Sequence, residues 1–355
     1  MAVKQSQFQI ESKCYIIKSL NFIPQIKFRQ TKFMLTYILF ALGFAILIKG
    51  ADFLVKGGSA LGLRLRISGL IIGLTVIAFG TSAPELIVNL FASSSEASQI
   101  AVGNIIGSNI ANILLILGVS AIVFPLVVTE DTVWIQIPLS LLAVVALGIL
   151  ASDALIDNAT SSVLSRTDGI ILLLFFAIFF YYIIDRARKQ RSTIYVTETI
   201  LEKGHDSWLK ILSYLAVGLV GLYFGGQWIV NGAIKMSEAL GISQSIIGLT
   251  VVAIGTSLPE LATSAVAAYR KNPDLAVGNI VGSNIFNVFF VLAISAIIRP
   301  LPFDSANNFS LIIAIASSLL LFIVMFTGRK RHLLERWEGI LFLLLYIGFI
   351  LYSVL

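Results

Sequence analysis

The sequence has few charged residues and almost none of the side chains that bind soft metals. Charged residues make up 12% of the 355 residues, whereas a soluble domain has about 25%. Cys14 is the single cysteine, which excludes a disulfide within the chain. His205 and His332 fall in separate polar segments, which favours solvated loop histidines over metal ligands. These scarcities disfavour a soluble domain, a disulfide scaffold and a zinc or copper centre.

Apolar residues are abundant instead, at 57% of the chain with a mean hydropathy of +0.94. Apolar runs of about 20 residues recur along the whole length, which is typical of transmembrane helices. The chain is therefore expected to be an all-α protein of the lipid bilayer, and its net charge of +6 to reflect loop topology rather than nucleic-acid binding. Ten spans are predicted, near 35–57, 68–92, 100–124, 132–151, 169–185, 209–231, 244–269, 275–298, 309–327 and 338–354.

A polar segment at 186–208 divides these spans into two sets of five. We expect a first five-helix unit over 34–185, a short linker, and a second unit over 209–355. Residues 1–33 carry six Lys/Arg and lack the apolar core of a signal peptide. They form either a genuine basic tail or the product of an upstream start codon, with Met34 opening the protein.

The two units are repeats. Glu85 aligns with Glu260 and Asn112 with Asn287 at one offset of 175 residues, and 29 of 55 positions are identical between 71–125 and 246–300. Since five spans are an odd number, the second copy must enter the membrane from the opposite side, as in the inverted repeats of many transporters. With the Met34 end outside, thirteen Lys/Arg lie in inner loops and three in outer loops, which places the linker in the cytoplasm.

Each repeat carries a helix-breaking polar block, "GTSAPE" or "GTSLPE". Gly80 and Pro84 interrupt helical hydrogen bonding, which is tolerated in a membrane only where the backbone lines a cavity or is buried. Thr81 and Ser82 precede Glu85 by four and three residues, so the three side chains share a helix face. The following blocks, "GNIIGSNIAN" and "GNIVGSNIFN", similarly place Ser108 four residues before Asn112, and Ser283 four before Asn287.

Two carboxylates, two amides and several hydroxyls form an all-oxygen set, which suits hard cations such as Ca²⁺ and Na⁺. An ionisable group at the centre of a bilayer costs about 2.5–3.5 kcal/mol on insertion scales, and Glu85 facing Glu260 would add repulsion. A divalent cation removes both penalties. The sequence thus predicts a desolvated cation site between the repeats.

Other roles compete for some of these residues. Glycines in membrane helices often allow close packing, which is our expectation for Gly103, Gly107, Gly278 and Gly282. A neutral glutamate could instead serve as an interhelical hydrogen-bond donor, although its duplication argues against that. For Asn109 and Asn284 the choice between packing and binding stays open. Asp52, with Lys49 and Lys56 nearby and Gln227 as its counterpart, is expected to form an ion pair.

At these blocks the sequence resembles the cation/Ca²⁺ exchanger superfamily, specifically the prokaryotic sodium/calcium exchangers, whose two alpha-repeats match the paired motifs over 34–355. The resemblance implies ten helices, breaks in helices 2 and 7, four cation sites between the paired hairpins, and a first and a sixth helix that slide across the remaining bundle. It also implies a multi-pass protein of the cytoplasmic membrane with no cofactor.

The resemblance further assigns roles to individual residues. Glu85 and Glu260 would be the central ligands of Ca²⁺ and Na⁺, with Asn112 and Asn287 flanking them. Backbone carbonyls and hydroxyls would complete the metal sites, from Thr81, Thr256, Ala78 and Ala253 for the carbonyls and Ser82, Ser257, Ser108 and Ser283 for the hydroxyls.

Two differences from the motifs of related families limit which ion can be coupled to Ca²⁺ transport. Potassium-dependent relatives have Asp at the position of Asn287, so the Asn/Asn pair here disfavours potassium transport. The proton-coupled branch has a GNxxE pattern where this chain has Gly107 and Gly282. The expected function is antiport of Na⁺ against Ca²⁺, with Ca²⁺ extruded. A cation/H⁺ antiporter on the same fold is the alternative.

Two other classes are disfavoured. A passive channel would not need inverted repeats with broken helices. Paired carboxylates could support hydrolysis, but there is no HExxH motif and the amides have no catalytic task, so we do not expect an enzyme. We expect the lipid bilayer and the transported ions as partners, with no obligatory protein partner and no nucleic acid.

Overall fold

The computed structural model describes residues 36–94, 98–156, 159–194, 206–240, 253–304, 307–328 and 330–354. Within these residues, eight helices are long and apolar enough to cross a membrane, and a bent pair raises the number to nine. The predicted span 244–269 is described only from residue 253, so the predicted count of ten stays a prediction. The basic tail at 1–33 lies outside the described residues.

The second span is bent by 45° at Ser82, between Gly69–Thr81 and Ala83–Ser93. It consists of α2 (Gly69–Ile72), the π-helix η1 (Gly73–Ile77), α3 (Ala78–Thr81) and α4 (Ala83–Ser94). Ser82 has φ −85° and ψ 6°, in the sparsely populated bridge region. Pro84 follows in the first turn of α4, where its missing N–H is tolerated. The interruption predicted at "GTSAPE" is therefore present.

The second half repeats this break. The helix α12 (Ala253–Thr256) is separated from α13 (Leu258–Tyr269) at Ser257, whose φ of −88° and ψ of 4° match those of Ser82. The segment before Ala253 lies outside the described residues. The next elements recur with the same offset of 175 residues at most of their boundaries: α5 (Ser98–Ile110), η2 (Ala111–Leu117) and α6 (Gly118–Val123) correspond to α14 (Pro273–Phe286), η6 (Asn287–Leu292) and α15 (Ala293–Ile298).

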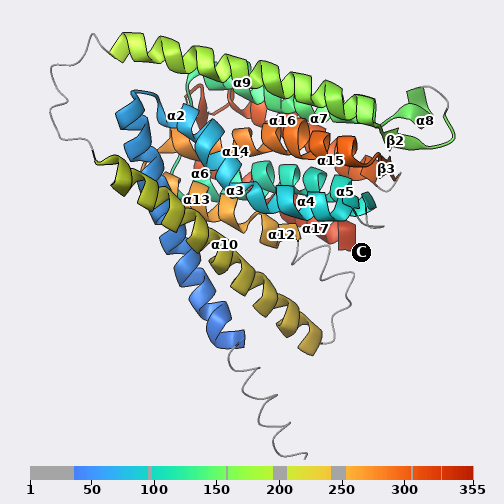
Figure 1. Cartoon of the computed structure of the whole chain (residues 1–355), viewed down its shortest axis with the longest axis horizontal. Coiled ribbons are helices and arrows are strands. Elements are labelled where there is room, and N and C mark those ends of the chain that lie inside the picture. Colours follow the sequence, from blue (N-terminus) through green and yellow to red (C-terminus); the bar gives the residue numbers. More distant parts are fainter. Residues whose placement is uncertain are drawn as a thin grey trace, which may run out of the picture.

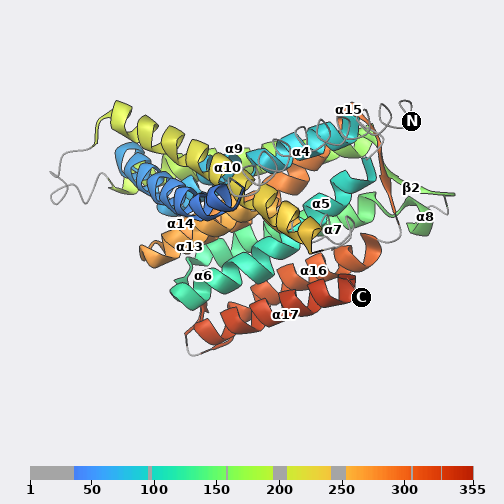
Figure 2. The same cartoon turned by 90° about the horizontal axis from the view of Figure 1, so that it is seen from below.

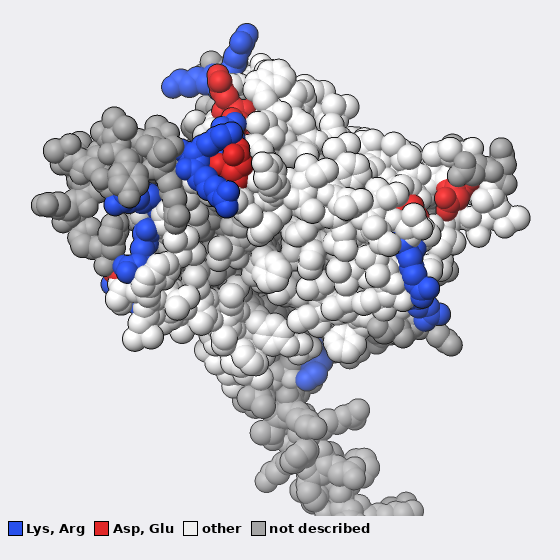
Figure 3. All heavy atoms as spheres, turned by 45° about the horizontal axis from the view of Figure 1, so that its top comes forward, with Lys and Arg blue, Asp and Glu red and all other residues white. Residues whose placement is uncertain are grey.

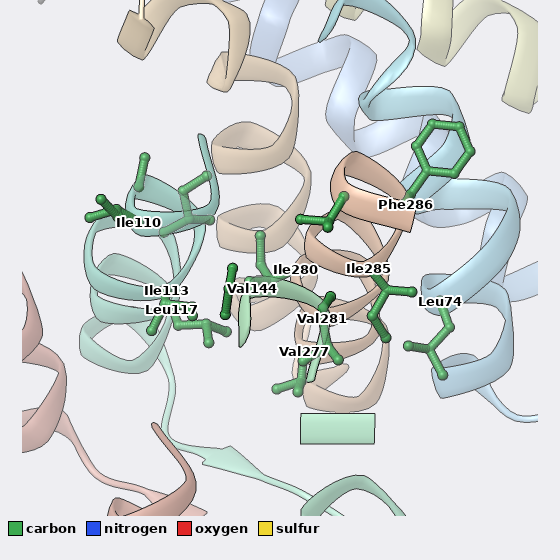
Figure 4. Close-up of a cluster of buried hydrophobic side chains, with 14 of the residues drawn as sticks. Leu74, Ile110, Ile113, Leu117, Val144, Val277, Ile280, Val281, Ile285 and Phe286 are labelled. Atoms are coloured by element: carbon green, nitrogen blue, oxygen red, sulfur yellow. The ribbon is translucent and has the colours of Figure 1, made fainter. Parts of the chain in front are cut away.

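The core lies around α14, η2 and η1, where the two halves meet (Figure 4). Leu74 of η1 lies near Val281 and Ile285 of α14, with Ile113 of η2 and Val144 of α7 (Ile137–Leu150) in the same cluster. In the most apolar 18-residue stretch of each span, 83% is buried for Pro273–Ile298 and 78% for Ala101–Val123. The two spans that carry the predicted asparagine ligands are thus the most enclosed parts of the described chain.

Two long helices form a separate pair on one face of this core. The first helix, Thr36–Leu65, lies beside α10 (Trp208–Ala239) in both views (Figures 1 and 2). In the most apolar 18-residue stretch of each helix, only 33% is buried for the first helix and 28% for α10. Glycines set their contact: a Cβ added at Gly50 would lie 2.7 Å from the backbone nitrogen of Leu222, and one at Gly225 would lie 2.7 Å from that of Leu47. Such backbone-to-backbone packing is typical of membrane helices.

The remaining helices surround the core: η3 (Thr132–Gln136) leads into α7, α9 (Arg166–Ile194) packs on α15, and α16 (Asn307–Val324) and α17 (Arg336–Val354) cover the face opposite the pair (Figure 2). The linker was predicted over 186–208, and α9 continues into this segment as far as Ile194. Arg, Lys and Gln favour helix, and Lys189 forms an i,i+4 ion pair with Asp185 at 2.6 Å.

Four strands of two or three residues lie at helix ends, and the all-α prediction did not include them. Strand β1 (Leu126–Val127) pairs with β4 (Leu333–Leu334), and β2 (Ser162–Leu164) pairs with β3 (Leu301–Phe303), both antiparallel. The short helix α8 (Asp153–Ile156) precedes β2. Each strand pair joins one strand from each half, so the halves are tied together at both places.

Charged side chains gather mainly toward opposite ends of the molecule, and the surface between them is almost wholly uncharged in the view of Figure 3. Large apolar side chains such as Phe91, Tyr181 and Leu212 are exposed. Exposed Trp134, Trp208 and Trp337 lie close to helix starts, as aromatic anchors at a membrane interface do. This distribution fits a protein whose middle is surrounded by lipid.

The glycine packing can be tested with two neighbouring substitutions. Gly225→Ala should lower the thermal unfolding temperature of the purified protein, because its Cβ meets backbone atoms at 2.7 and 2.9 Å and overpacking costs about 1–3 kcal/mol. Gly226→Ala is the matched control, since its Cβ meets a single side-chain atom at 3.9 Å, and it should gain up to about 1 kcal/mol of helix propensity. Equal unfolding temperatures for the two variants would contradict the close contact.

Candidate cation-binding site

The two predicted carboxylates are buried near the breaks in their helices. Glu85 and Glu260 are each 1% exposed and lie in the first turns of α4 and α13. The N-terminal turn of a helix carries a partial positive charge and N–H groups without helical partners, which stabilise a nearby carboxylate. The helix breaks therefore place each acid where a new helix begins, deep inside the protein.

Hydroxyls from the opposite half hold each carboxylate. The Ser82 hydroxyl donates to Glu260 Oε1 at 2.8 Å and lies 2.9 Å from Ser283 Oγ, and Thr81 also interacts with Glu260. The equivalent partners of Glu85 are Ser257 and Thr256, and the oxygens of Ser257 and Ser108 are 3.5 Å apart. The two carboxylates are close enough for their charges to repel each other.

The predicted amide ligands lie where α-helix changes to π-helix. Asn112 is the second residue of η2, and Asn287 is the first residue of η6. Both side chains are 1% exposed. A π-helical segment widens the backbone spiral, and such segments occur frequently at functional sites. The change of helix type determines which side chains of these spans face inward.

Four buried oxygens of this site have no hydrogen-bond partner among the described residues: Glu85 Oε2, Glu260 Oε2, Asn112 Oδ1 and Asn287 Oδ1. Leaving such a buried acceptor unpaired costs about 1–3 kcal/mol, and more for a charged group. Two are carboxylate and two are amide oxygens, contributed equally by the two halves. Oxygens of this kind are the ligands that Ca²⁺ and Na⁺ require, so the arrangement is fitted to bind a hard cation.

The backbone-carbonyl ligands are less directly supported. The carbonyl of Ala78 accepts from the Ser82 N–H at 2.9 Å, so one of its lone pairs is engaged, and Thr81 Oγ1 lies 3.3 Å from the same oxygen. Ala253 is the first residue of α12. The structure thus joins Ser82 and Ser283 to Glu260 and buries the two predicted amides, and the ligand roles of all these residues stay predictions.

Sequence reasoning did not assign two further amides of the repeated blocks. Asn279 accepts from the Thr81 hydroxyl at 3.1 Å and donates to Ser264 at 2.9 Å. Asn104 donates to Asn89 at 3.1 Å. Asn104 and Asn279 are equivalent in the repeat alignment, which is the one signal that could have pointed to them. Their different partners follow from Asn89 in one half and Ser264 in the other.

The predicted packing glycines are confirmed in the second half. A Cβ at Gly278 would lie 2.6 Å from the carbonyl oxygen of Leu70, and one at Gly282 would lie 2.8 Å from the Cα of Leu74. The equivalent neighbours of Gly103 and Gly107 fall within 241–252, outside the described residues. Their packing role therefore stays a prediction.

The predicted ion pair of Asp52 is confirmed and has an additional partner. Asp52 lies 2.9 Å from Lys56 and also pairs with Arg270. Arg270 ends α13, so this ion pair joins the first helix to the α13–α14 turn. Asn272 of the same turn donates to Ser59 at 3.3 Å.

A bundle of apolar helices around a buried all-oxygen cage defines a membrane transporter of hard cations. The family model described as "Sodium/calcium exchanger protein" matches residues 35–184 and 210–355. The chain therefore belongs to the sodium/calcium exchanger family, whose members are cation/Ca²⁺ antiporters rather than enzymes.

Individual relatives agree with this membership. The chain is 37% identical to a putative antiporter, CaxA, of Alkalimonas amylolytica, over 89% of this chain and 98% of the relative. It is 32% identical to the sodium/calcium exchanger MaX1 of Methanosarcina acetivorans, over 88% and 97%. Among solved structures, the sodium-calcium exchanger NCX_Mj, soaked with Na⁺ and Sr²⁺, superimposes with a TM-score of 0.75 at 35% identity, over 89% of this chain and 98% of that one.

The buried like charges predict an unusual stability effect. Without Ca²⁺ or Na⁺, Glu85→Gln and Glu260→Gln should each raise the thermal unfolding temperature by about 2 °C or more, because one charge of a repelling buried pair is removed. Added Ca²⁺ should stabilise the wild type but neither variant, since a ligand stabilises only the state that binds it. Glu130→Gln, at an exposed residue, is the control and should leave both temperatures unchanged. A Ca²⁺-induced shift of wild-type size in both site variants would contradict this site.

Proposed function

We propose that this chain exchanges Na⁺ for Ca²⁺ across the cytoplasmic membrane by alternating access and extrudes Ca²⁺ from the cell. The four buried oxygens without a partner among the described residues carry the proposal, because two of them belong to carboxylates whose charges a Ca²⁺ ion would neutralise. The named activity of MaX1 and the Na⁺ and Sr²⁺ used with NCX_Mj support Na⁺ and a divalent cation as the substrates.

Coupling follows from the charge of the cage. An empty cage keeps two like charges buried, and ionised groups at this depth cost about 2.5–3.5 kcal/mol each on insertion scales. The conformational change that carries the site across the membrane is therefore favourable only when cations occupy it. Because Na⁺ and Ca²⁺ need the same carboxylates, one must leave before the other binds. Exchange rather than leakage results.

The moving part would be the pair formed by the first helix and α10. Close glycine contacts make this pair one unit, while it is much less buried than the spans that carry Asn112 and Asn287. A rigid pair that slides past a packed core would expose the site to one side and then to the other, as the resemblance implies. The two repeats would then run in opposite directions through the membrane, with the site between them.

Transport into sealed vesicles tests the coupling ion. Purified protein is reconstituted into liposomes, and ⁴⁵Ca²⁺ uptake is measured with an outward Na⁺ gradient, with an imposed pH gradient, or with neither. Uptake that requires internal Na⁺ is expected. Uptake driven by the pH gradient and indifferent to Na⁺ would establish the cation/H⁺ alternative. Uptake without any counter-ion gradient, down the Ca²⁺ gradient alone, would indicate a channel and overturn the proposal.

The two carboxylates are tested in the same assay. Glu85→Gln and Glu260→Gln should lower Na⁺-driven uptake by at least about 100-fold, because removing one charge from a buried charged site costs about 3–5 kcal/mol. The variant Glu130→Gln should transport like the wild type. Retention of wild-type rates in either site variant, with equal protein incorporated, would refute the assignment of that carboxylate.

A further inference from the structure

Two asparagines of the repeated blocks have no role in the function described so far. Asn109 and Asn284 each precede a ligand asparagine by three residues, and all four amides are buried at 1% exposure. Burial of a polar amide is costly unless its groups are paired. Their partners therefore indicate why four amides are buried together.

The four amides pair across the two halves. The Asn112 Nδ2 group donates to Asn284 Oδ1 at 2.9 Å, and the Asn287 Nδ2 group donates to Asn109 Oδ1 at 3.3 Å. Asn109 donates in turn to the backbone carbonyl of Asn284 at 3.4 Å. Each ligand amide of one half is thus held by an asparagine of the other half.

This pairing determines which end of each ligand amide faces the cage. An amide carries its acceptor oxygen and its donor nitrogen on opposite sides. With Nδ2 bound to the partner asparagine, Oδ1 of Asn112 and of Asn287 points away from that partner, and these are two of the four oxygens without partners. A rotation of 180° would present N–H groups to the cation site, and these cannot bind a cation.

We propose that Asn109 and Asn284 are positioning residues that keep the oxygens of Asn287 and Asn112 directed at the cation. The inference rests on the proposed function, since it concerns the same site. The two positioning residues do not touch the ion, so their loss acts through the ligand amides. The cage then depends on the contact between the halves, because neither half orients its own amide.

The decisive experiment is a double-mutant cycle on Ca²⁺ binding. Equilibrium binding of ⁴⁵Ca²⁺ is measured on the purified full chain in Na⁺-free buffer for the wild type, Asn284→Leu, Asn112→Ala and the double variant. Asn284→Leu removes the acceptor at nearly constant volume and should weaken Ca²⁺ binding by about 10-fold. In the Asn112→Ala background the same change should have no further effect, because the amide that it orients is already gone.

Two controls separate positioning from general damage. Asn284→Gln keeps an uncharged amide acceptor for Asn112 and should retain more Ca²⁺ affinity than Asn284→Leu. Asn104→Leu removes a half-buried amide from the helix that precedes η2, which donates to Asn89, and should leave Ca²⁺ affinity unchanged. If Asn284→Leu binds like the wild type, or weakens binding equally in both backgrounds, the positioning role is overturned. Asn109→Leu with Asn287→Ala repeats the cycle if Asn284→Leu does not fold.

The same cycle on thermal unfolding, measured without ions, keeps this inference distinct from the proposed function. Asn284→Leu should lower the unfolding temperature in the wild type, because it leaves a buried Nδ2 group unpaired, and should lower it less in Asn112→Ala. A wild type that bound no Ca²⁺ would overturn the exchange function even with a coupled unfolding cycle. Normal Ca²⁺ binding with an additive unfolding cycle would overturn the amide pairing alone.

Discussion

The burial of two like-charged carboxylates, each with an oxygen left unpaired, is the constraint on which the rest of this structure depends. Glu85 and Glu260 cannot be solvated where they lie, and they repel each other. The helix breaks at Ser82 and Ser257 give each acid a helix N-terminus. Hydroxyls of the opposite half bind the acids from the other side. The oxygens that these contacts leave unpaired among the described residues are the ones that the proposed cation would bind.

The proposed exchange assigns binding and movement to different parts of the molecule. The spans that carry the asparagine ligands are enclosed on nearly all sides, which keeps ligand oxygens in position. The first helix and α10 are exposed along much of their length and pack mainly on each other through glycines. A site that must bind ions of two sizes needs ligand residues held in fixed positions, whereas access from either side of the membrane needs helices that can move. Placing the ligands and the movable helices in different parts of the protein meets both requirements.

Much of the site could be predicted because its chemistry is local in sequence. Thr81, Ser82 and Glu85 share a face by helical spacing, and duplication at one offset gives the second set without structural information. The break at Ser82 follows from the residues around Pro84. By contrast, the π-helices that begin at Ala111 and Asn287 have no sequence signature here, since apart from one asparagine each they consist of apolar residues that an α-helix would hold equally well.

Features that are not local in sequence also account for what sequence reasoning left open or missed. Asn109 and Asn112 are three residues apart and share a helix face, but the pairing of their amides with Asn284 and Asn287 becomes visible only when the halves are packed together. The extension of α9 to Ile194 was missed because charged residues were equated with a loop. A helix that leaves the bilayer keeps its backbone hydrogen bonds, and charged side chains are well solvated on it.

The two strand pairs, each formed by one strand from each half, bear on how a protein of this kind can evolve. Strands β1 and β2 of the first half find their partners only in β4 and β3 of the second, so a half produced alone would retain open strand edges and half a cage. Two copies of one ancestral half could close those edges on each other, each completing its twin. Joining the two halves in one polypeptide kept them together permanently and allowed their sequences to diverge. The equivalent residues Asn89 and Ser264 are one example of this divergence.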